Sequence, residues 1–333
     1  MNIVTGGTGL LGSHILFELS KNEAPIKAFY RNKDRCNSTL KLFLFYDPIN
    51  GQKLFDRIDW VQCDVLDIPQ LEEEIVTNST VYHCAALVSF HPKDFNQLLK
   101  TNKEGTSNIV NVCIDKKIKK LCYVSSTAAI GGEDNKLTTE ETKWKNSPET
   151  SGYSISKYCA EREVWIGIEE GLNAVIINPC VILGPGNWNE SSLTIFNTVK
   201  KGIRFYPPGA NATVDARDVA TSLIKLGNSD IQAERFLCIG SNQSFKELTD
   251  EIATQLNVTR PKKQVSKWMV NVARRILSFV AWITRSRSSI TKETVNSLFG
   301  IKSYSAEKLH SVIDVKFHSL KEQVQNSIKG RQF

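Results

Sequence analysis

The chain of 333 residues lacks an apolar run long enough to cross a membrane, which takes about 18 consecutive apolar residues. The nearest approach, residues 268–283, is interrupted by Arg274 and Arg275. The first strand is expected at residue 1 or 2, so we also expect no signal peptide. These absences predict a cytoplasmic protein with no integral membrane segment.

Metal-binding patterns are missing too. The five histidines do not cluster, and the chain has neither a His-Glu-x-x-His nor a Cys-x-x-Cys motif. The eight cysteines fall mostly in apolar runs, which is typical of reduced, buried side chains. The net charge of +7 is spread along the chain, as on an ordinary solvated surface, although it would also suit an anionic ligand. We therefore expect no metal and no nucleic-acid partner.

What the sequence does contain is an alternation of short apolar strands with helical segments. Strands are expected at 2–4, 26–30, 58–63, 80–84, 120–126 and 173–179, and helices near 10–21, 67–77, 93–116 and 152–170. Strands without an alternating polar face suit a sheet that is covered on both sides. Strands that alternate with helices imply right-handed βαβ crossovers. The pattern predicts an α/β protein with a Rossmann-type, doubly wound parallel sheet.

The pattern changes after residue 180. Loops are expected at 184–188 and 206–211, a strand at 235–240, and helices near 215–227, 244–256, 268–284, 291–299 and 305–312. We predict a nucleotide-binding Rossmann domain of residues 1–180 plus 212–240. The rest, 181–211 plus 241–333, is predicted to form a smaller, mostly helical substrate lobe over the carboxyl ends of the strands, where open α/β sheets bind ligands.

A glycine-rich loop, "TGGTGLLG" (5–12), follows the first strand and opens the first helix. Glycine permits the tight turn and lets a pyrophosphate approach the backbone, and the helix N-terminus attracts phosphates. A merely tight strand-to-helix turn is the alternative. The expected dinucleotide contacts in this loop are Gly6, Thr8, Gly9, Leu10, Leu11 and Gly12.

The second expected strand ends in Arg31, where an acid would favour NAD. An arginine there can hold a 2′-phosphate, so we favour NADP(H) over NAD(H), with Lys33 and Arg35 assisting. A plain surface arginine is the alternative. In "CDVLD" (63–67), Asp64 and Val65 are expected at the adenine, and Asp67 is expected to cap the next helix.

Three further residues suggest acid–base chemistry. Tyr153 and Lys157 are four residues apart, which places them on one face of a helix. The lysine ammonium is expected to lower the tyrosine pKa, so that the phenol can exchange a proton near neutral pH. Ser126 ends the fifth expected strand, where its hydroxyl can hold a substrate oxygen. The alternatives are a surface pair on the helix and hydroxyls that only satisfy the strand end.

Together these motifs resemble the extended short-chain dehydrogenase/reductase family, within the NAD-dependent epimerase/dehydratase superfamily. The branch that the chain resembles is the dihydroflavonol-4-reductase-like and 3β-hydroxysteroid-dehydrogenase-like one. The resemblance covers roughly residues 1–260 and rests on "TGGTGLLG", "CDVLD", "VYHCAALVSF", "TNKEGTSNIV", "YVSS", "YSISK", "INPCVILGPG" and "VDARDVA".

The resemblance assigns roles to residues that match these motifs. It implies a catalytic set of Ser126, Tyr153 and Lys157, with Asn102 as a fourth member, and gives Lys157 a second contact with the cofactor's ribose. Further cofactor contacts are implied for Cys84, Ala85, Ala86, Pro179 and Val181, and a structural role for Asp215, Arg217 and Asp218. It also implies a homodimer through the helices near 93–116 and 152–170.

The substrate is expected to meet Val88, Phe90, Asn187 and Trp188. A helical stripe of Met269, Val272, Ile276, Phe279, Val280 and Ile283, broadened by Trp268 and Trp282, has three interpretations. It forms the packed core of the lobe, an apolar wall of the pocket, or a contact with a membrane surface.

These observations predict an NADP(H)-dependent oxidoreductase that interconverts a carbonyl and a secondary alcohol on a small, rather apolar molecule. One alternative is a nucleotide-sugar epimerase or dehydratase that retains NAD. The sequence departs from that class at "NPC" (178–180) and at Ser126-Thr127-Ala128. The second alternative, a non-catalytic dinucleotide-binding regulator, would not need the Ser/Tyr/Lys set.

Overall fold

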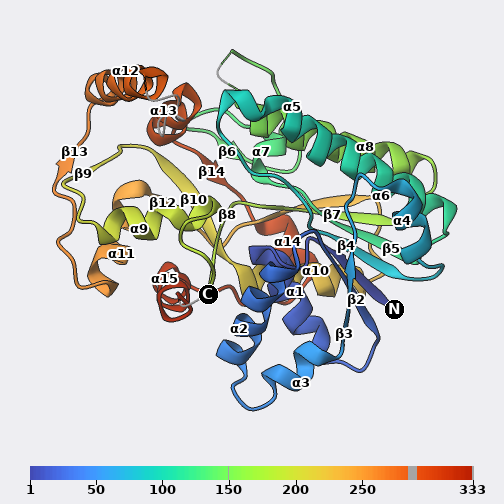
Figure 1. The fold of residues 1–333 in the computed structure, drawn as a ribbon. Helices are drawn as coiled ribbons and strands as arrows, with labels where there is room; N and C mark the ends of the chain where they lie inside the picture. The colour runs from blue at the N-terminus through green and yellow to red at the C-terminus, as the bar shows by residue number, and fades with distance from the viewer. Residues whose placement is uncertain (149, 284–290, 332–333) are drawn as a thin grey trace.

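A seven-stranded sheet lies at the centre of the computed structural model, which describes residues 1–148, 150–283 and 291–331 (Figure 1). Its strand order is β11-β7-β5-β4-β1-β2-β3, and all neighbours are parallel. The strands are β1 (Asn2–Thr5), β2 (Ile26–Tyr30), β3 (Ile58–Gln62), β4 (Thr80–His83), β5 (Lys120–Val124), β7 (Ala174–Pro179) and β11 (Glu234–Cys238). The strand order reverses between β1 and β4, so the predicted doubly wound Rossmann-type sheet is confirmed.

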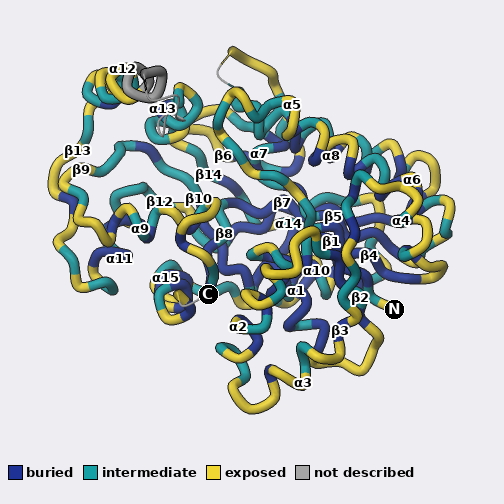
Figure 2. The backbone as a smooth tube through the Cα atoms, in the orientation of Figure 1, coloured by how far each residue is buried: buried dark blue, intermediate teal, exposed yellow. Residues whose placement is uncertain are grey.

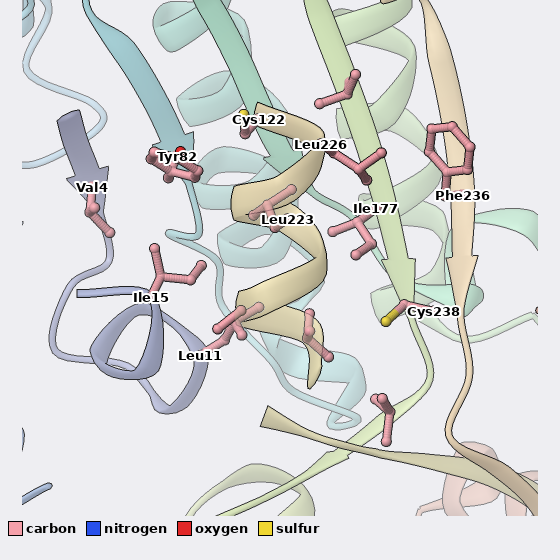
Figure 3. Packing of buried hydrophobic residues seen from close by; sticks show 14 of the residues in the cluster. Val4, Leu11, Ile15, Tyr82, Cys122, Ile177, Leu223, Leu226, Phe236 and Cys238 are labelled. Atoms are coloured by element: carbon pink, nitrogen blue, oxygen red, sulfur yellow. The ribbon is translucent and has the colours of Figure 1, made fainter. Parts of the chain in front are cut away.

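Helices cover both faces of this sheet. One face carries α1 (Leu10–Ser20), α2 (Cys36–Tyr46), α3 (Gly51–Asp56), α10 (Ala216–Gly227) and α14 (Glu307–Val312), and the other carries α4 (Ile68–Glu74), α6 (Gly105–Asp115) and α8 (Gly152–Glu169). Figure 3 shows Leu223 and Leu226 on α10, which lies against the strands beside α1. Most residues of the strands other than the edge strand β3 are buried (dark blue in Figure 2), which explains why these strands lack a polar alternation.

The C-terminal region mixes helices with short strands. A three-stranded sheet joins β8 (Val181–Leu183), β10 (Ala210–Asp215) and β12 (Ser241–Ser244) in the order β12-β10-β8. Two pairs of two-residue strands are β9 (Phe205–Tyr206) with β13 (Lys263–Gln264), and β6 (Leu137–Thr138) with β14 (Ser303–Tyr304). The helices are α9 (Thr194–Lys200), α11 (Phe245–Gln255), α12 (Lys267–Ile283), α13 (Lys292–Phe299) and α15 (Leu320–Lys329).

Several elements differ from the sequence prediction. The single helix expected at 93–116 is a 3₁₀ turn (Pro92–Asp94), α5 (Phe95–Leu98), a π-helical stretch (Leu99–Glu104) and α6. The fifth strand ends at Val124 because Ser126 caps the short helix α7 (Thr127–Ile130). Helices α2, α3 and α15 were not predicted. The expected loop at 206–211 runs into β10, whose partners lie far away in the sequence.

Candidate active site

The glycine-rich loop connects β1 to α1 with very little space around its backbone. Gly6 has a φ of +66°, and a Cβ on it would lie 2.8 Å from Ala85 Cα. A Cβ on Gly12 would lie 2.2 Å from the Gly6 carbonyl oxygen. Gly9 caps α1 without a side-chain hydrogen bond, so the helix N-terminus faces the cleft with backbone alone. Only glycine fits at positions 6 and 12. The loop leaves backbone N–H groups available to a phosphate.

A cleft of about 1550 Å³ extends from this loop across the carboxyl ends of the strands. Most of the predicted site residues line it: Gly6, Thr8, Gly9, Leu10, Leu11, Gly12, Arg31, Cys84, Ala86, Val88, Phe90, Ser126, Tyr153, Lys157, Pro179, Val181 and Asn187. Five do not, namely Asp64, Val65, Ala85, Asn102 and Trp188. The structure therefore brings together residues from β1, β2, β4, β5, β7 and α8 that are far apart in the sequence.

The end of the cleft at β2 is basic. Arg31 follows β2, and Arg35 and Ser38 line the same end. Arg35 forms an ion pair with Glu190, which lies in the loop after β8. Asp64 and Val65, which were expected at the adenine, do not line the cleft. Asp64 accepts a hydrogen bond from Leu66 N at 3.0 Å, and Val65 packs against Gly105. Asp67 caps α4 by accepting from Gln70 N, as predicted.

Ser126, Tyr153 and Lys157 meet at the middle of the cleft. Ser126 follows β5 and its Oγ accepts from Ala128 N at 3.2 Å, while its hydroxyl also interacts with the Tyr153 phenol. Tyr153 lies in the first turn of α8, with its ring 5.6 Å from that of Phe90 between centroids. One turn later, Lys157 Nζ donates to Tyr123 Oη at 3.0 Å and to Val124 O at 2.9 Å.

The protonation of these groups differs from the sequence prediction. Burial raises the pKa of Tyr153, an effect that its hydrogen bond with Ser126 opposes. Burial also lowers the pKa of Lys157 to about 8. The expectation that the lysine lowers the tyrosine pKa is therefore wrong for this structure. Desolvation dominates at both groups, and the ammonium is directed at Tyr123 and Val124.

A buried polar network lies behind Lys157 and was not predicted. Glu161, the next residue along this face of α8, accepts from Ser125 Oγ at 2.6 Å and from Asn178 Nδ2 at 2.7 Å. It also forms an ion pair with Arg235 of β11 at 3.1 Å. The sequence signal for this network was an acid four residues after Lys157, on the same face of the helix. The network fixes α8 to three strands of the sheet.

Asn102 lies in the π-helical stretch and is buried rather than exposed to the cleft. Its Oδ1 accepts from Leu87 N at 2.7 Å, and its Nδ2 donates to Leu87 O at 3.0 Å and to Ser156 Oγ at 2.9 Å. Ser156 directly precedes Lys157 in α8. The side chain thus joins the segment after β4 to the helix that carries Tyr153 and Lys157.

The residues expected at the substrate separate into two groups. Val88, Phe90 and Asn187 line the cleft. Trp188 is buried in the C-terminal region, where its ring stacks on Phe196 at 5.0 Å and Arg331 lies over it. The cleft is also lined by residues that sequence reasoning did not single out: Ile182, Leu193, Ile195, Phe245, Leu248, Glu293, Asn296 and Leu298.

The predicted apolar stripe on α12 does not line the cleft in the part of the helix whose side chains are described, residues 267–277. Val272 is 37% exposed and Ile276 is 58% exposed, and Trp268 beside them is 72% exposed. Phe279, Val280, Trp282 and Ile283 lie outside the residues whose side chains are described.

Of the side chains of Asp215, Arg217 and Asp218, that of Asp218 contacts a distant segment, whereas the contact between Asp215 and Arg217 is local to the start of α10. Asp215 caps α10 and pairs with Arg217 at 2.8 Å. Asp218 accepts from the backbone N and the ring of His318, just before α15. All eight cysteines are free, and among the described residues no three His, Cys, Asp or Glu side chains gather as a metal ion would require.

A model of the NAD dependent epimerase/dehydratase family matches residues 2–204, which is more than half of the chain. The chain belongs to this family. It is an enzyme family of NAD(P)-dependent epimerases and reductases. The resemblance to extended short-chain dehydrogenases/reductases that the motifs indicate is confirmed.

Relatives within the family include reductases. A protein of Synechocystis sp. assigned as a dihydroflavonol 4-reductase is 28% identical over 275 residues, covering 80% of this chain and 75% of the other. Cinnamoyl-CoA reductase 1 of Petunia hybrida is 27% identical over 256 residues, or 72% of each chain.

Among solved structures, a UDP-N-acetylglucosamine 4-epimerase from Methanobrevibacter ruminantium M1, in complex with UDP-N-acetylmuramic acid, superimposes with a TM-score of 0.76. It is 18% identical, and the match covers 99% of this chain and 97% of the epimerase. At that identity the match shows the shared fold.

Among the described residues, no helix is long and apolar enough to span a membrane.

Proposed function

We propose that this protein is an NADP(H)-dependent oxidoreductase that interconverts a carbonyl and a secondary alcohol on a small, rather apolar substrate. The observation that carries the proposal is the meeting of Ser126, Tyr153 and Lys157 in the same cleft as the glycine-rich loop. The reductase names of the relatives support it.

The residues of the cleft fit a dinucleotide. The backbone of Gly6 to Gly12 and the N-terminus of α1 would hold the pyrophosphate, since added side chains at Gly6 and Gly12 would fill the space that the loop needs. Arg31, Arg35 and Ser38 would hold a 2′-phosphate, which is why we favour NADP(H). When bound, the nicotinamide supplies or accepts the hydride.

The chain's own groups handle the proton and the substrate oxygen. The raised pKa of Tyr153 keeps its phenol protonated at neutral pH, which is the form that can donate a proton to a carbonyl oxygen during reduction. Ser126 donates a hydrogen bond to the same oxygen. Lys157, which donates to Tyr123 and Val124, would also hold the ribose hydroxyls of a bound dinucleotide, and Asn102 would act as a positioning residue for the turn that carries Lys157.

The test is the activity of Tyr153→Phe on a panel of ketones, aldehydes and secondary alcohols, followed by the absorbance of NADPH. Loss of the phenolic proton should lower kcat by about 10²- to 10⁴-fold. NADPH affinity, measured by calorimetry, should hardly change because the ring remains. Full turnover by the variant would refute the role of Tyr153.

A nucleotide-sugar epimerase or dehydratase is the second candidate, favoured by the superposition on the epimerase structure. Against it, Asn178 is buried and donates to Ser126 O and Glu161, so it does not face the cleft as a sugar ligand. Tightly retained NAD after purification, with turnover of a UDP-sugar and no net oxidation of cofactor, would favour this candidate.

A homodimer through α6 and α8 is a further expectation, which light scattering would test.

A further inference from the structure

Helix α12 lies at the edge of the C-terminal region, where it packs on α13 (Figure 1). Among residues 267–277, Val270 is the one buried hydrophobic side chain. Trp268, Val272 and Ile276 are exposed and spaced by four residues, so they lie on one face of the helix. A soluble helix would normally bury such a face, so its exposure requires an explanation.

The surroundings of this apolar face are strongly basic. The sequence from 252 to 292 contains no Asp or Glu. From 257 to 277 it carries six basic residues, namely Arg260, Lys262, Lys263, Lys267, Arg274 and Arg275. The strand β13, which precedes the helix, pairs with β9. Two exposed residues at the start of β9 therefore lie near this basic segment: Arg204, which precedes the strand, and Phe205, which is 41% exposed. We call the exposed members Arg204, Phe205, Lys262, Lys263, Lys267, Trp268, Val272, Arg275 and Ile276 the basic–apolar surface.

Two of the three interpretations of the stripe do not account for this arrangement. Over residues 267–277 the stripe is not packed core, because Trp268 and Ile276 are more than half exposed. It is not a pocket wall over residues 267–277, because the cleft is lined there by α13 through Glu293, Asn296 and Ser297. What remains is a surface that binds something outside the protein.

We propose that the basic–apolar surface docks on an anionic lipid bilayer. An amphipathic helix with Lys and Arg beside Trp and aliphatic residues lies in the plane of the interface, with its apolar face at the boundary of headgroups and acyl chains. The cations of Arg204, Lys262, β13 and α12 match the negative surface potential of phosphatidylserine-type lipids. A nucleic acid would engage the charges but would leave Val272 and Ile276 in water.

Docking would have a consequence for the cleft. Because α12 packs on α13, and α13 lines the cleft, the bilayer would lie next to the end of the cleft formed by Glu293 and Asn296. An apolar substrate dissolved in lipid would then enter from that side. The docking itself does not depend on the proposed reaction and is tested without any substrate.

The experiment is flotation of the full chain with vesicles of phosphatidylcholine alone or with about 30% phosphatidylserine. We expect the protein to float with the anionic vesicles, to stay behind with the neutral ones, and to be released at about 0.5 M salt. The paired variant Trp268→Ser with Ile276→Ser should lower the partition coefficient by at least about tenfold. Lys263→Gln and Lys267→Gln should each lower it about fivefold.

Matched controls come from α3 and the loop before it, which lie outside the basic–apolar surface. Ile49→Ser removes a side chain that is 90% exposed, and Lys53→Gln removes an exposed cation of α3. Both should float like the wild type. Thermal unfolding should be unchanged in every variant, because the substituted side chains are exposed.

Three outcomes would overturn the proposal. The first is equal flotation with neutral and anionic vesicles, or none with either. The second is flotation that neither the paired Trp268→Ser and Ile276→Ser variant nor the two single lysine variants reduce. The third is a concentration-dependent dimer in light scattering that Trp268→Ser with Ile276→Ser abolishes while vesicles capture nothing, which would assign the surface to contact between two copies of the chain.

Discussion

Lys157 is a buried cation whose protonated form the fold disfavours. It is 2% exposed, and burial lowers its pKa from 10.5 to about 8. The difference of about 2.5 pKa units (10.5 − 8) corresponds to about 3 kcal/mol, at about 1.4 kcal/mol for each unit. Below pH 8 the folded protein carries this whole penalty. Above pH 10.5 the lysine is neutral in both states and the penalty is gone.

The sign of the effect follows from proton binding. Between pH 8 and 10.5 the unfolded chain holds the proton on Lys157 more tightly than the folded protein does. Stability from this residue therefore rises with pH across that window. Other groups act in the opposite direction, since the buried thiols of Cys63 and Cys180 have a pKa raised to about 12. The wild type alone therefore cannot isolate the lysine.

The decisive comparison is with Lys157→Met, by urea denaturation from pH 7.5 to 10.5. The variant loses the hydrogen bonds to Tyr123 and Val124, at a cost of about 1–3 kcal/mol that does not depend on pH in this range. The free energy of unfolding of the wild type, relative to the variant, should rise by about 3 kcal/mol across the window. Lys53→Met, at an exposed site, should show no such slope. A constant difference between wild type and Lys157→Met would refute the argument.

Three further substitutions test other parts of the site. Gly12→Ala places a Cβ 2.2 Å from Gly6 O, so the loop must move, and calorimetry should show at least about tenfold weaker NADPH binding. Arg31→Ser should weaken NADPH by about tenfold or more while NADH is unaffected; equal losses for both would contradict a 2′-phosphate contact. Glu161→Ala should lower the free energy of unfolding by about 3 kcal/mol, measured with urea, because Arg235, Ser125 and Asn178 lose their partner; Glu161→Gln should cost less.

The parts of the fold that sequence predicts are those with local signals. A glycine-rich turn between a strand and a helix, and a Tyr–Lys pair one helical turn apart, need no knowledge of distant residues. The N-terminus of α15 carries such a local signal as well, because Ser319 and Glu322 form a capping box.

What could not be predicted depends on contacts between distant segments. The pKa of Tyr153 is set by burial beneath side chains from other parts of the chain, not by the lysine one turn away. Trp188 is buried rather than in the cleft because α9 and α15 close over it, with Ser327 O accepting from its indole N at 3.3 Å. The strand pairs β10–β12 and β6–β14 likewise join segments that no local pattern connects.

The two sides of the cleft come from different stretches of the chain. The glycine-rich loop, Ser126, Tyr153 and Lys157 all precede residue 180, and α8 is held from behind by Glu161 and Asn102. The facing side, with Ile195, Phe245 and Leu298, comes after it. Selection can therefore act on the two sides separately. Substitutions in the later stretch can change the shape of its part of the cleft while Ser126, Tyr153 and Lys157 stay in place.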